Sequence, residues 1–345
     1  MDYLTSYLQR PKLGDARHPT LWPSEASAMI EDTHGRPKVV GKCRRSTFFR
    51  YLVSNYKFYN KYSHLSLLVN DIEQKYISPD RYLLWLWAAG ELYEEYIVNL
   101  SKAAGIFVET QTQVYVPEQN VSGKIDVITI NPDSGKKRIN EIKSVYGFGA
   151  NAVLGTPYER KKGLSGTPRD SNLMQIALYH WKIAANNSNF ENSALLYGSR
   201  DTGRYAEYSI WTENQDGYTI IKYQGISPKI TTAIQSPITI DSILQDGYQY
   251  VINHLEAGEV PPRDYELQYT QEKINELYND KELSKTDTEK HEKILERITD
   301  NILRIEAGKK PLKELKPIEK GDWQCDRCSY KNVCYNENQE PREIK

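Results

Sequence analysis

The stretch GKIDVITINPDSGKKRINEIKSV, residues 123–145, decides the fold. β-favouring residues dominate both of its ends, with Ile and Val recurring between polar residues. Its middle, NPDSG at 131–135, holds the Pro and Gly that are typical of a turn. We therefore predict a β-hairpin whose turn is centred near residue 133.

Two carboxylates and an ammonium come together in this hairpin. Side chains alternate between the two faces of a strand, so Glu141 and Lys143 share one face while Ile142 points to the other, into the core. Folding the arms about residue 133 brings Asp126 roughly opposite Asn140 or Glu141. The three charged groups are then within cross-strand reach of one another.

Two interpretations of this cluster are open. Acid–x–Lys triplets are common, and an ordinary surface ion pair would explain this one. The acids, however, lie inside apolar β runs, where an unpaired charge is costly. Clustered carboxylate oxygens suit Mg²⁺ or Mn²⁺, and a lysine beside such a metal can hold a water or a phosphate oxygen. That combination is typical of a hydrolytic site for phosphodiesters.

This arrangement resembles the PD-(D/E)XK nuclease superfamily, with Asp126 and Glu141-Ile142-Lys143 in the motif positions. The resemblance implies an α/β protein with a restriction-endonuclease-like mixed β-sheet core flanked by helices. It also implies that Asp126, Glu141 and Lys143 are catalytic. Asp126, Glu141 and the Ile142 backbone carbonyl would then bind the metal.

A long helix is predicted from Ser78-Pro79 to Gly105, because Ser caps helices, Pro is favoured at the first position and Gly at the end. Its residues leave little polar face, so we expect it to be largely buried. Glu94 lies one turn after Gly90 on the same face. The pair resembles the Gly-x-x-x-His first motif of RecB-type nucleases, with Glu94 in place of His. The resemblance makes Glu94 a metal ligand; the alternative is a solvent-facing acidic stripe.

Residues 144–170 are rich in Gly and basic side chains, and we interpret them as a loop that covers the substrate. A helix capped by Asp170 or Ser171 follows. Its Gln175 and Tyr179 are one turn apart and match the Gln-x-x-x-Tyr motif of RecB-type nucleases, which implies that they position Lys143 and the phosphate or a base. Further strands are predicted at 111–116, 193–199 and 205–211.

The net charge of −1 gives no global field that would recruit DNA, so a nucleic-acid site must be a local basic patch. Candidate patches are 36–50 and 160–169. The alternative is that both stretches are ordinary charged surfaces that face solvent. The DNA contacts expected from them are Arg44, Arg45, Lys161, Lys162 and Arg169. A mean hydropathy of −0.68, no apolar run of membrane length and no signal-peptide core predict a soluble, cytoplasmic protein without membrane contact.

The chain has four cysteines, and three of them, Cys325, Cys328 and Cys334, are close in sequence. In an intracellular protein Cys-x-x-Cys favours a metal or redox role over a structural disulfide. A closed tetrahedral site needs a fourth ligand, and Cys43 is the remaining thiol. Four thiolates suit either zinc or an iron–sulfur cluster, and the spacing does not choose between them.

One cysteine before the nuclease motifs and three after them resembles the CRISPR-associated RecB-like exonuclease group and the AddB nuclease domain. This resemblance implies a [4Fe–4S] cluster on Cys43, Cys325, Cys328 and Cys334, with zinc as the alternative. It covers about residues 24–215 and 320–335.

The expected organisation has four parts: a nuclease core at 1–215, a connecting segment at 216–263, a helical insertion at 264–310 and a C-terminal cysteine segment at 311–345. The expected function is a Mg²⁺- or Mn²⁺-dependent deoxyribonuclease, foremost a single-stranded DNA exonuclease in recombination, repair or DNA processing. The partners would be DNA ends and a helicase or recombination complex. The alternatives are a nuclease-derived DNA-binding module of such a complex and a zinc-stabilised structural protein.

Overall fold

The computed structural model describes residues 19–163, 166–226 and 232–335, and the expected segments at 1–215, 144–170, 216–263 and 311–345 lie partly outside these ranges. The chain divides into two compact units, and the division falls after Asp264. Among the described residues, no helix has the length and hydropathy of a membrane span.

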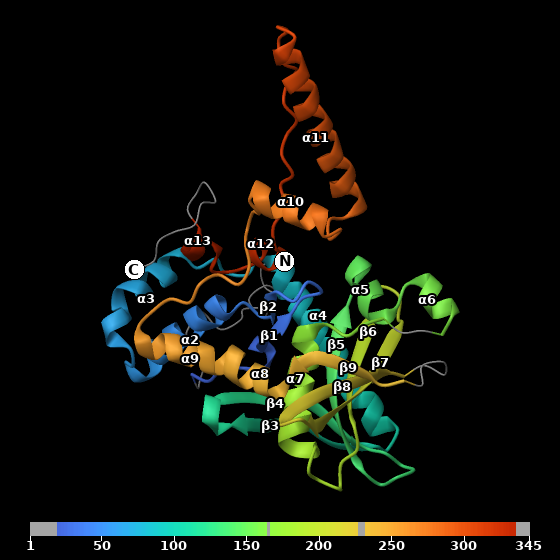
Figure 1. The fold of residues 1–345 in the computed structure, drawn as a ribbon. Coiled ribbons are helices and arrows are strands. Elements are labelled where there is room, and N and C mark those ends of the chain that lie inside the picture. The colour runs from blue at the N-terminus through green and yellow to red at the C-terminus, as the bar shows by residue number, and fades with distance from the viewer. Residues whose placement is uncertain (1–18, 164–165, 227–231, 336–345) are drawn as a thin grey trace. The chain divides into compact units, whose positions relative to one another are not determined.

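A mixed sheet of seven strands forms the centre of the first unit in its described part (Figure 1). The strands follow the chain order β3 to β9, and every neighbouring pair is antiparallel except β5–β6. They are β3 (Phe107–Val116), β4 (Val121–Ile130), β5 (Lys137–Val145), β6 (Ser193–Ser199), β7 (Tyr205–Gln215), β8 (Tyr218–Gly225) and β9 (Ile234–Thr239). The predicted hairpin is confirmed as β4–β5, and β8 and β9 extend the sheet through the expected connecting segment.

Two helices cover opposite faces of the sheet. Helix α4 (Arg81–Ala103) packs through Val98 against Val127 and Ile142. Helix α7 (Asp170–Tyr179) crosses from β5 to β6 and lies on the other face, where its Asn172 accepts a hydrogen bond from the Tyr197 hydroxyl at 3.0 Å. Tyr197 is the register partner of Lys143 in the parallel pair. Glu141 and Lys143 therefore project toward the α7 side.

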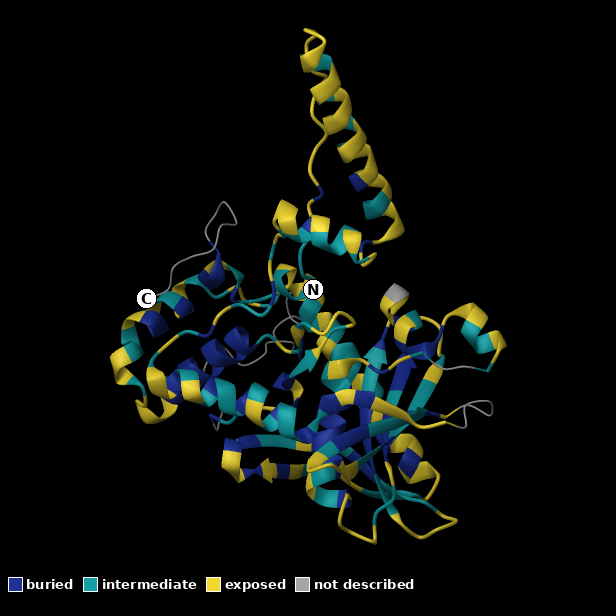
Figure 2. Ribbon diagram, in the orientation of Figure 1, coloured by how far each residue is buried: buried dark blue, intermediate teal, exposed yellow. Residues whose placement is uncertain are grey.

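Helix α4 is the main correction to the sequence interpretation. It begins at Arg81 instead of Pro79, because Asp80 is the N-cap and its side chain accepts from the Leu83 N–H at 2.8 Å. The expected burial is wrong, since Val98 and Ser101 alone are buried among its residues (Figure 2). Apolar residues surround the helix on all sides, but only one side meets the sheet. The exposed ones are Tyr82, Trp85, Trp87, Leu92, Tyr96 and Leu100.

The segment expected as a loop after β5 contains two short helices, α5 (Gly147–Leu154) and α6 (Pro157–Lys161). Thr156 caps α6 because its hydroxyl accepts from the Glu159 N–H, and the Glu159 carboxylate accepts from the Thr156 N–H. The local capping box explains why this Gly-rich stretch holds helical turns.

The remaining elements of the first unit surround this core. Pro23–Glu25 form a 3₁₀ turn, and an antiparallel pair of strands follows it. The elements are β1 (Ser27–Glu31), β2 (Pro37–Gly41), α2 (Arg44–Tyr59), α3 (Ser66–Lys75), and α8 (Ile240–Ser242), which continues through π-helical residues 243–249 into α9 (Tyr250–Ala257). Arg44 at the start of α2 forms a buried ion pair with Asp264 at 2.7 Å.

The second unit is helical in its described part, with α10 (Gln271–Asn279), α11 (Lys285–Glu306), α12 (Trp323–Asp326) and α13 (Lys331–Cys334). Its small core joins Ile274, Leu283 and Ile318, with Ile294 packed against them. Ser284 caps α11 by accepting from the Asp287 N–H at 3.1 Å. Beyond Ile294, the isoleucines of α11 are exposed to solvent (Figure 2).

Candidate active site

Asp126 and Glu141 lie where the two arms of the hairpin separate. The β4–β5 register ends at Val127 opposite Asn140, and Asp126 and Glu141 are the next residues on the two strands. Past this point a side chain of β4 bonds to the backbone of β5: the Asp126 Oδ2 accepts from the Ile142 N–H at 2.7 Å. Of the two cross-strand partners considered from sequence, the register therefore favours Glu141.

Glu141 has no solvent-exposed surface, and its Oε1 accepts from the Lys143 ammonium at 2.5 Å. Burial raises the pKa of Glu141 to about 8, with the Asp126 charge adding to the shift and Lys143 opposing it. Burial also raises the pKa of Asp126, again against Lys143. Burial by itself would lower the pKa of Lys143, but Glu141 and Asp126 outweigh it, so the pKa is raised and the lysine stays charged.

Glu94 on α4 joins this cluster through its charge. Burial, followed by the neighbouring Asp126, raises the pKa of Glu94 to about 7. Its Oε1 accepts from the Gln111 side-chain amide at 2.6 Å. A methyl at Gly90 would lie 3.5 Å from Ser144 Oγ, an ordinary contact, so the helix–strand approach does not itself demand the glycine of the predicted motif.

Gln111 is a site residue that the sequence analysis missed. It lies in β3 between Thr110 and Thr112, which pair with Val127 and Ile125, so it is opposite Asp126. Its φ of 56° is in the left-handed region, which non-glycine residues seldom adopt. Strain of this kind persists where surrounding contacts enforce it, often at functional sites. No local sequence signal indicates it, because Gln has no preference for that conformation.

Gln175 and Tyr179 form a hydrogen-bonded pair on α7, as their one-turn spacing predicts. Gln175 Nε2 donates to the Tyr179 hydroxyl at 3.5 Å, and that hydroxyl donates to the Lys124 carbonyl at 3.0 Å. Burial, then Glu141, raises the pKa of Tyr179, so it stays a neutral donor. The pair is thus fixed to β4, two residues before Asp126.

The donor set fits a hard divalent cation. Three carboxylates whose pKa values are all raised share one ammonium, so the cluster is short of positive charge. Glu141 Oε2 is buried and has no hydrogen-bond partner among the described residues. Among the described residues, no three acidic, His or Cys side chains are arranged to hold a metal ion. Gln111, the Ile142 N–H and Lys143 each engage one of the three carboxylates.

The basic residues predicted to contact DNA fall into two groups. Arg44 and Arg45 are buried, and Asp264 and the Tyr250 ring, 3.9 Å from the guanidinium, engage Arg44. The surface position that a phosphate contact needs is therefore not found for these two. Lys161, Lys162 and Arg169 are exposed around α6 and the start of α7. Their phosphate contacts stay a prediction.

The cysteines belong to different units. Cys43 precedes α2 in the first unit, whereas Cys325, Cys328 and Cys334 lie in the second. There, the Cys328 N–H donates to the Cys325 carbonyl at 3.2 Å, and the Cys334 N–H to the Tyr330 carbonyl at 3.2 Å. Asp322 anchors this segment by accepting from the Tyr269 hydroxyl and the Glu266 N–H, both at 2.8 Å. Successive short turns thus carry the three thiols.

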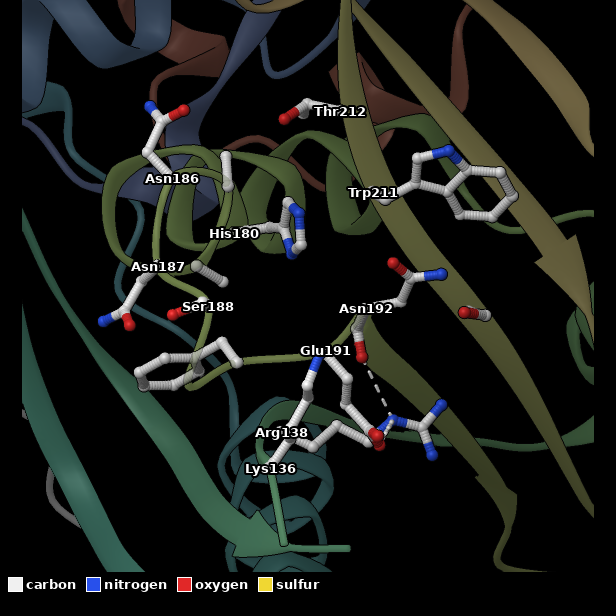
Figure 3. A pocket seen from close by; sticks show the side chains of 14 residues that line it. Lys136, Arg138, His180, Asn186, Asn187, Ser188, Glu191, Asn192, Trp211 and Thr212 are labelled. Carbon is white, nitrogen blue, oxygen red and sulfur yellow. Dashed lines mark hydrogen bonds and ion pairs between the residues drawn. The ribbon is translucent and has the colours of Figure 1, made fainter. Parts of the chain in front are cut away.

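A cleft of about 640 Å³ lies away from the carboxylates, at the start of β5 and β6 (Figure 3). His180 points into it and shares a 2.9 Å hydrogen bond with Ser193. Arg138, also in its lining, is engaged by Glu191 and Glu207. The lining includes neither the acidic cluster nor Lys143, so this cleft is not part of the candidate active site.

Comparison with protein-family models, with curated proteins and with solved structures finds no match to this chain. The functional assignment therefore depends on the geometry of the cluster and on the motif resemblance.

Proposed function

We propose that the protein is a metal-dependent deoxyribonuclease related to the RecB-like PD-(D/E)XK enzymes, acting foremost on single-stranded DNA or DNA ends. The observation that carries the proposal is the fully buried Glu141, held by Lys143 at 2.5 Å and placed beside Asp126 where β4 and β5 separate. Burying three acids with only one lysine among them costs free energy of folding, and such a cluster is typical of a site that binds a ligand.

The roles follow from the contacts. Glu94, Asp126 and Glu141, with the Ile142 carbonyl, would hold Mg²⁺ or Mn²⁺. The bound metal would lower the pKa of a water and offset charge on the scissile phosphate. Lys143 stays protonated and presents its ammonium to a phosphate oxygen, stabilising the charge that develops there. Tyr179, with Gln175 behind it, holds β4 in place next to Asp126.

The proposal extends to fold and cofactor. A mixed sheet with helices on both faces, and acids on the adjacent strands β4 and β5, is compatible with the restriction-endonuclease-like core that the resemblance implies. We also propose a [4Fe–4S] cluster on Cys43, Cys325, Cys328 and Cys334, with zinc as the alternative occupant. A helicase or recombination complex would be the partner, and the cytoplasm the location.

The test is cleavage of end-labelled single- and double-stranded DNA by the pure protein with Mn²⁺ or Mg²⁺. We expect single-stranded DNA to be degraded, EDTA to stop the reaction, and Asp126→Asn or Lys143→Ala to slow it at least about 100-fold. Both variants should keep the wild-type circular dichroism. Wild-type rates for either variant would mean that the site is misassigned. DNA binding with no cleavage under any metal would support the binding-module alternative.

A further inference from the structure

Two exposed tyrosines meet where the start of α4 lies against the end of β5. Tyr82, near the start of α4, shares a hydroxyl–hydroxyl hydrogen bond with Tyr146, which directly follows β5. Their side chains are 53% and 40% exposed. Trp85, one turn along the helix, is also 53% exposed. Single exposed aromatic residues are ordinary on a protein surface, but rings that gather in one place are typical of a binding surface.

Arg200 adds a positive charge to the same surface and fixes its geometry. Its guanidinium carbon lies 5.0 Å from the centroid of the Tyr146 ring, within cation–π range. The Arg200 Nη1 donates to the Leu86 carbonyl on α4 at 3.0 Å, and the Arg200 backbone N–H donates to the Val145 carbonyl at 2.9 Å. Three elements, α4, β5 and the turn after β6, thus hold the ring and the cation in place.

This surface shares its elements with the candidate active site, although Tyr146 contacts α4 whereas Lys143 projects toward α7. Tyr146 is three residues beyond Lys143, or about 10 Å at the rise of an extended strand. Both flanking elements are shared, since β5 carries Glu141 and Lys143 and α4 carries Glu94. A single strand that passed the end of β5 with one phosphate at Lys143 would carry a base to Tyr146 about three nucleotides away, at a spacing of about 3.4 Å.

We propose that Tyr82, Tyr146 and Arg200 form a stacking subsite for a nucleobase of a single-stranded nucleic acid. This inference rests on the proposed function, whose substrate it specifies. Exposed aromatic rings beside an arginine are what sequence-tolerant single-strand binding uses, because every base has a flat face. In a duplex those faces are covered by neighbouring base pairs, so only an unpaired base can use the subsite.

The test measures base stacking separately from cleavage. Fluorescence anisotropy in EDTA gives the Kd for a labelled oligothymidylate and for an abasic sugar–phosphate chain of the same length. We expect the wild type to bind the thymidine strand about tenfold more tightly than the abasic one. Tyr146→Leu should bring this ratio close to one without changing the abasic Kd, whereas Tyr146→Phe, which keeps the ring, should preserve it.

Tyr218→Leu is the matched control, because Tyr218 is 59% exposed at the start of β8. It should keep the tenfold ratio. Equal Kd values for both strands in the wild type, or an unchanged ratio in Tyr146→Leu, would overturn the subsite. If the protein prefers bases through Tyr146 but never cleaves DNA, the subsite stands and the proposed nuclease function is wrong. If it cleaves DNA without a preference for bases, the nuclease function stands and the subsite is wrong.

Discussion

Glu141 and Glu94 have pKa values near 8 and 7, so near neutral pH the metal-free cluster favours bound protons over full ionisation. A group whose folded pKa is raised stabilises the fold below its unfolded pKa and loses that contribution as pH rises through the folded value. Without metal, ionising these acids therefore weakens the fold between about pH 4.5 and 8. Cation binding releases the protons, so its affinity should rise across the upper part of that window.

Single substitutions can show whether Glu94, and not a neighbouring acid on α4, is the metal ligand. Glu94→Gln removes a half-buried carboxylate that lies close to Asp126, whereas Glu95→Gln removes an exposed one. We expect Glu94→Gln to raise the Mn²⁺ concentration for half-maximal cleavage at least about tenfold, with Glu95→Gln unchanged. The readout is a Mn²⁺ titration of initial cleavage rates. An unchanged titration for Glu94→Gln would assign the ligand elsewhere.

His180 predicts an acid-sensitive contribution to stability. Burial lowers its pKa from 6.5 to about 4. Below pH 6.5 the unfolded chain binds a proton that the folded chain refuses, so stability present above that pH is lost as pH falls toward 4. The loss from this residue is at most about 3 kcal/mol. His180→Gln cannot titrate and should show a smaller loss.

The measurement for His180 is urea unfolding at pH 7.5 and pH 4.5 for wild type and variant. The exposed His34, on the turn between β1 and β2, supplies the control His34→Gln, which should follow the wild type. The same loss of stability in all three proteins would refute the assignment.

Elements set by local pattern were predictable, and elements set by distant partners were not. The β4–β5 hairpin and the Gln175–Tyr179 spacing depend on periodicity and a turn within 60 residues, and the sequence carries both signals. The burial of α4 was wrong because an apolar helix surface does not show which side meets the sheet. Strands β8 and β9 were missed, since their pairing with each other and with β7 arises from tertiary structure. The place of Gln111 in the site was missed because it depends on the pairing of β3 with β4 and on Glu94 from α4.

The α12–α13 segment carries the cofactor prediction. Protein purified without air should be brown and hold about four irons per chain. Cys328→Ala and Cys43→Ala should each remove the colour and lower the thermal midpoint, because loss of a structural metal site costs folding free energy. Iron and zinc analysis with absorption spectra checks this. Colourless protein that holds about one zinc would show a zinc site in place of the cluster. Metal-free protein of unchanged stability would show that the four cysteines form no metal site.

At the scale of the whole molecule, the Arg44–Asp264 pair joins the start of α2 to the residue after which the chain passes into the second unit. The Arg44 and Asp264 side chains are 8% and 2% exposed, and Asp264 also accepts from the Arg44 N–H at 2.6 Å. Asp264→Asn leaves a buried guanidinium without its counter-charge and should lower the free energy of unfolding by about 3–5 kcal/mol.

Chemical denaturation followed by far-ultraviolet circular dichroism measures the effect of Asp264→Asn. The surface pair Lys57–Glu73 supplies the comparison, because both side chains are more than one third exposed. Glu73→Gln should cost less than about 1 kcal/mol. Equal effects from the two substitutions would show that the buried pair adds no more than the surface one.

The same pair has a consequence for biosynthesis. Arg44 and Asp264 are separated by 220 residues. At 5–20 residues per second, the ribosome takes roughly 10–45 s to deliver the carboxylate after the guanidinium. Through that interval the nascent chain carries an arginine whose counter-ion does not yet exist, so this buried pair cannot form until residue 264 has been translated.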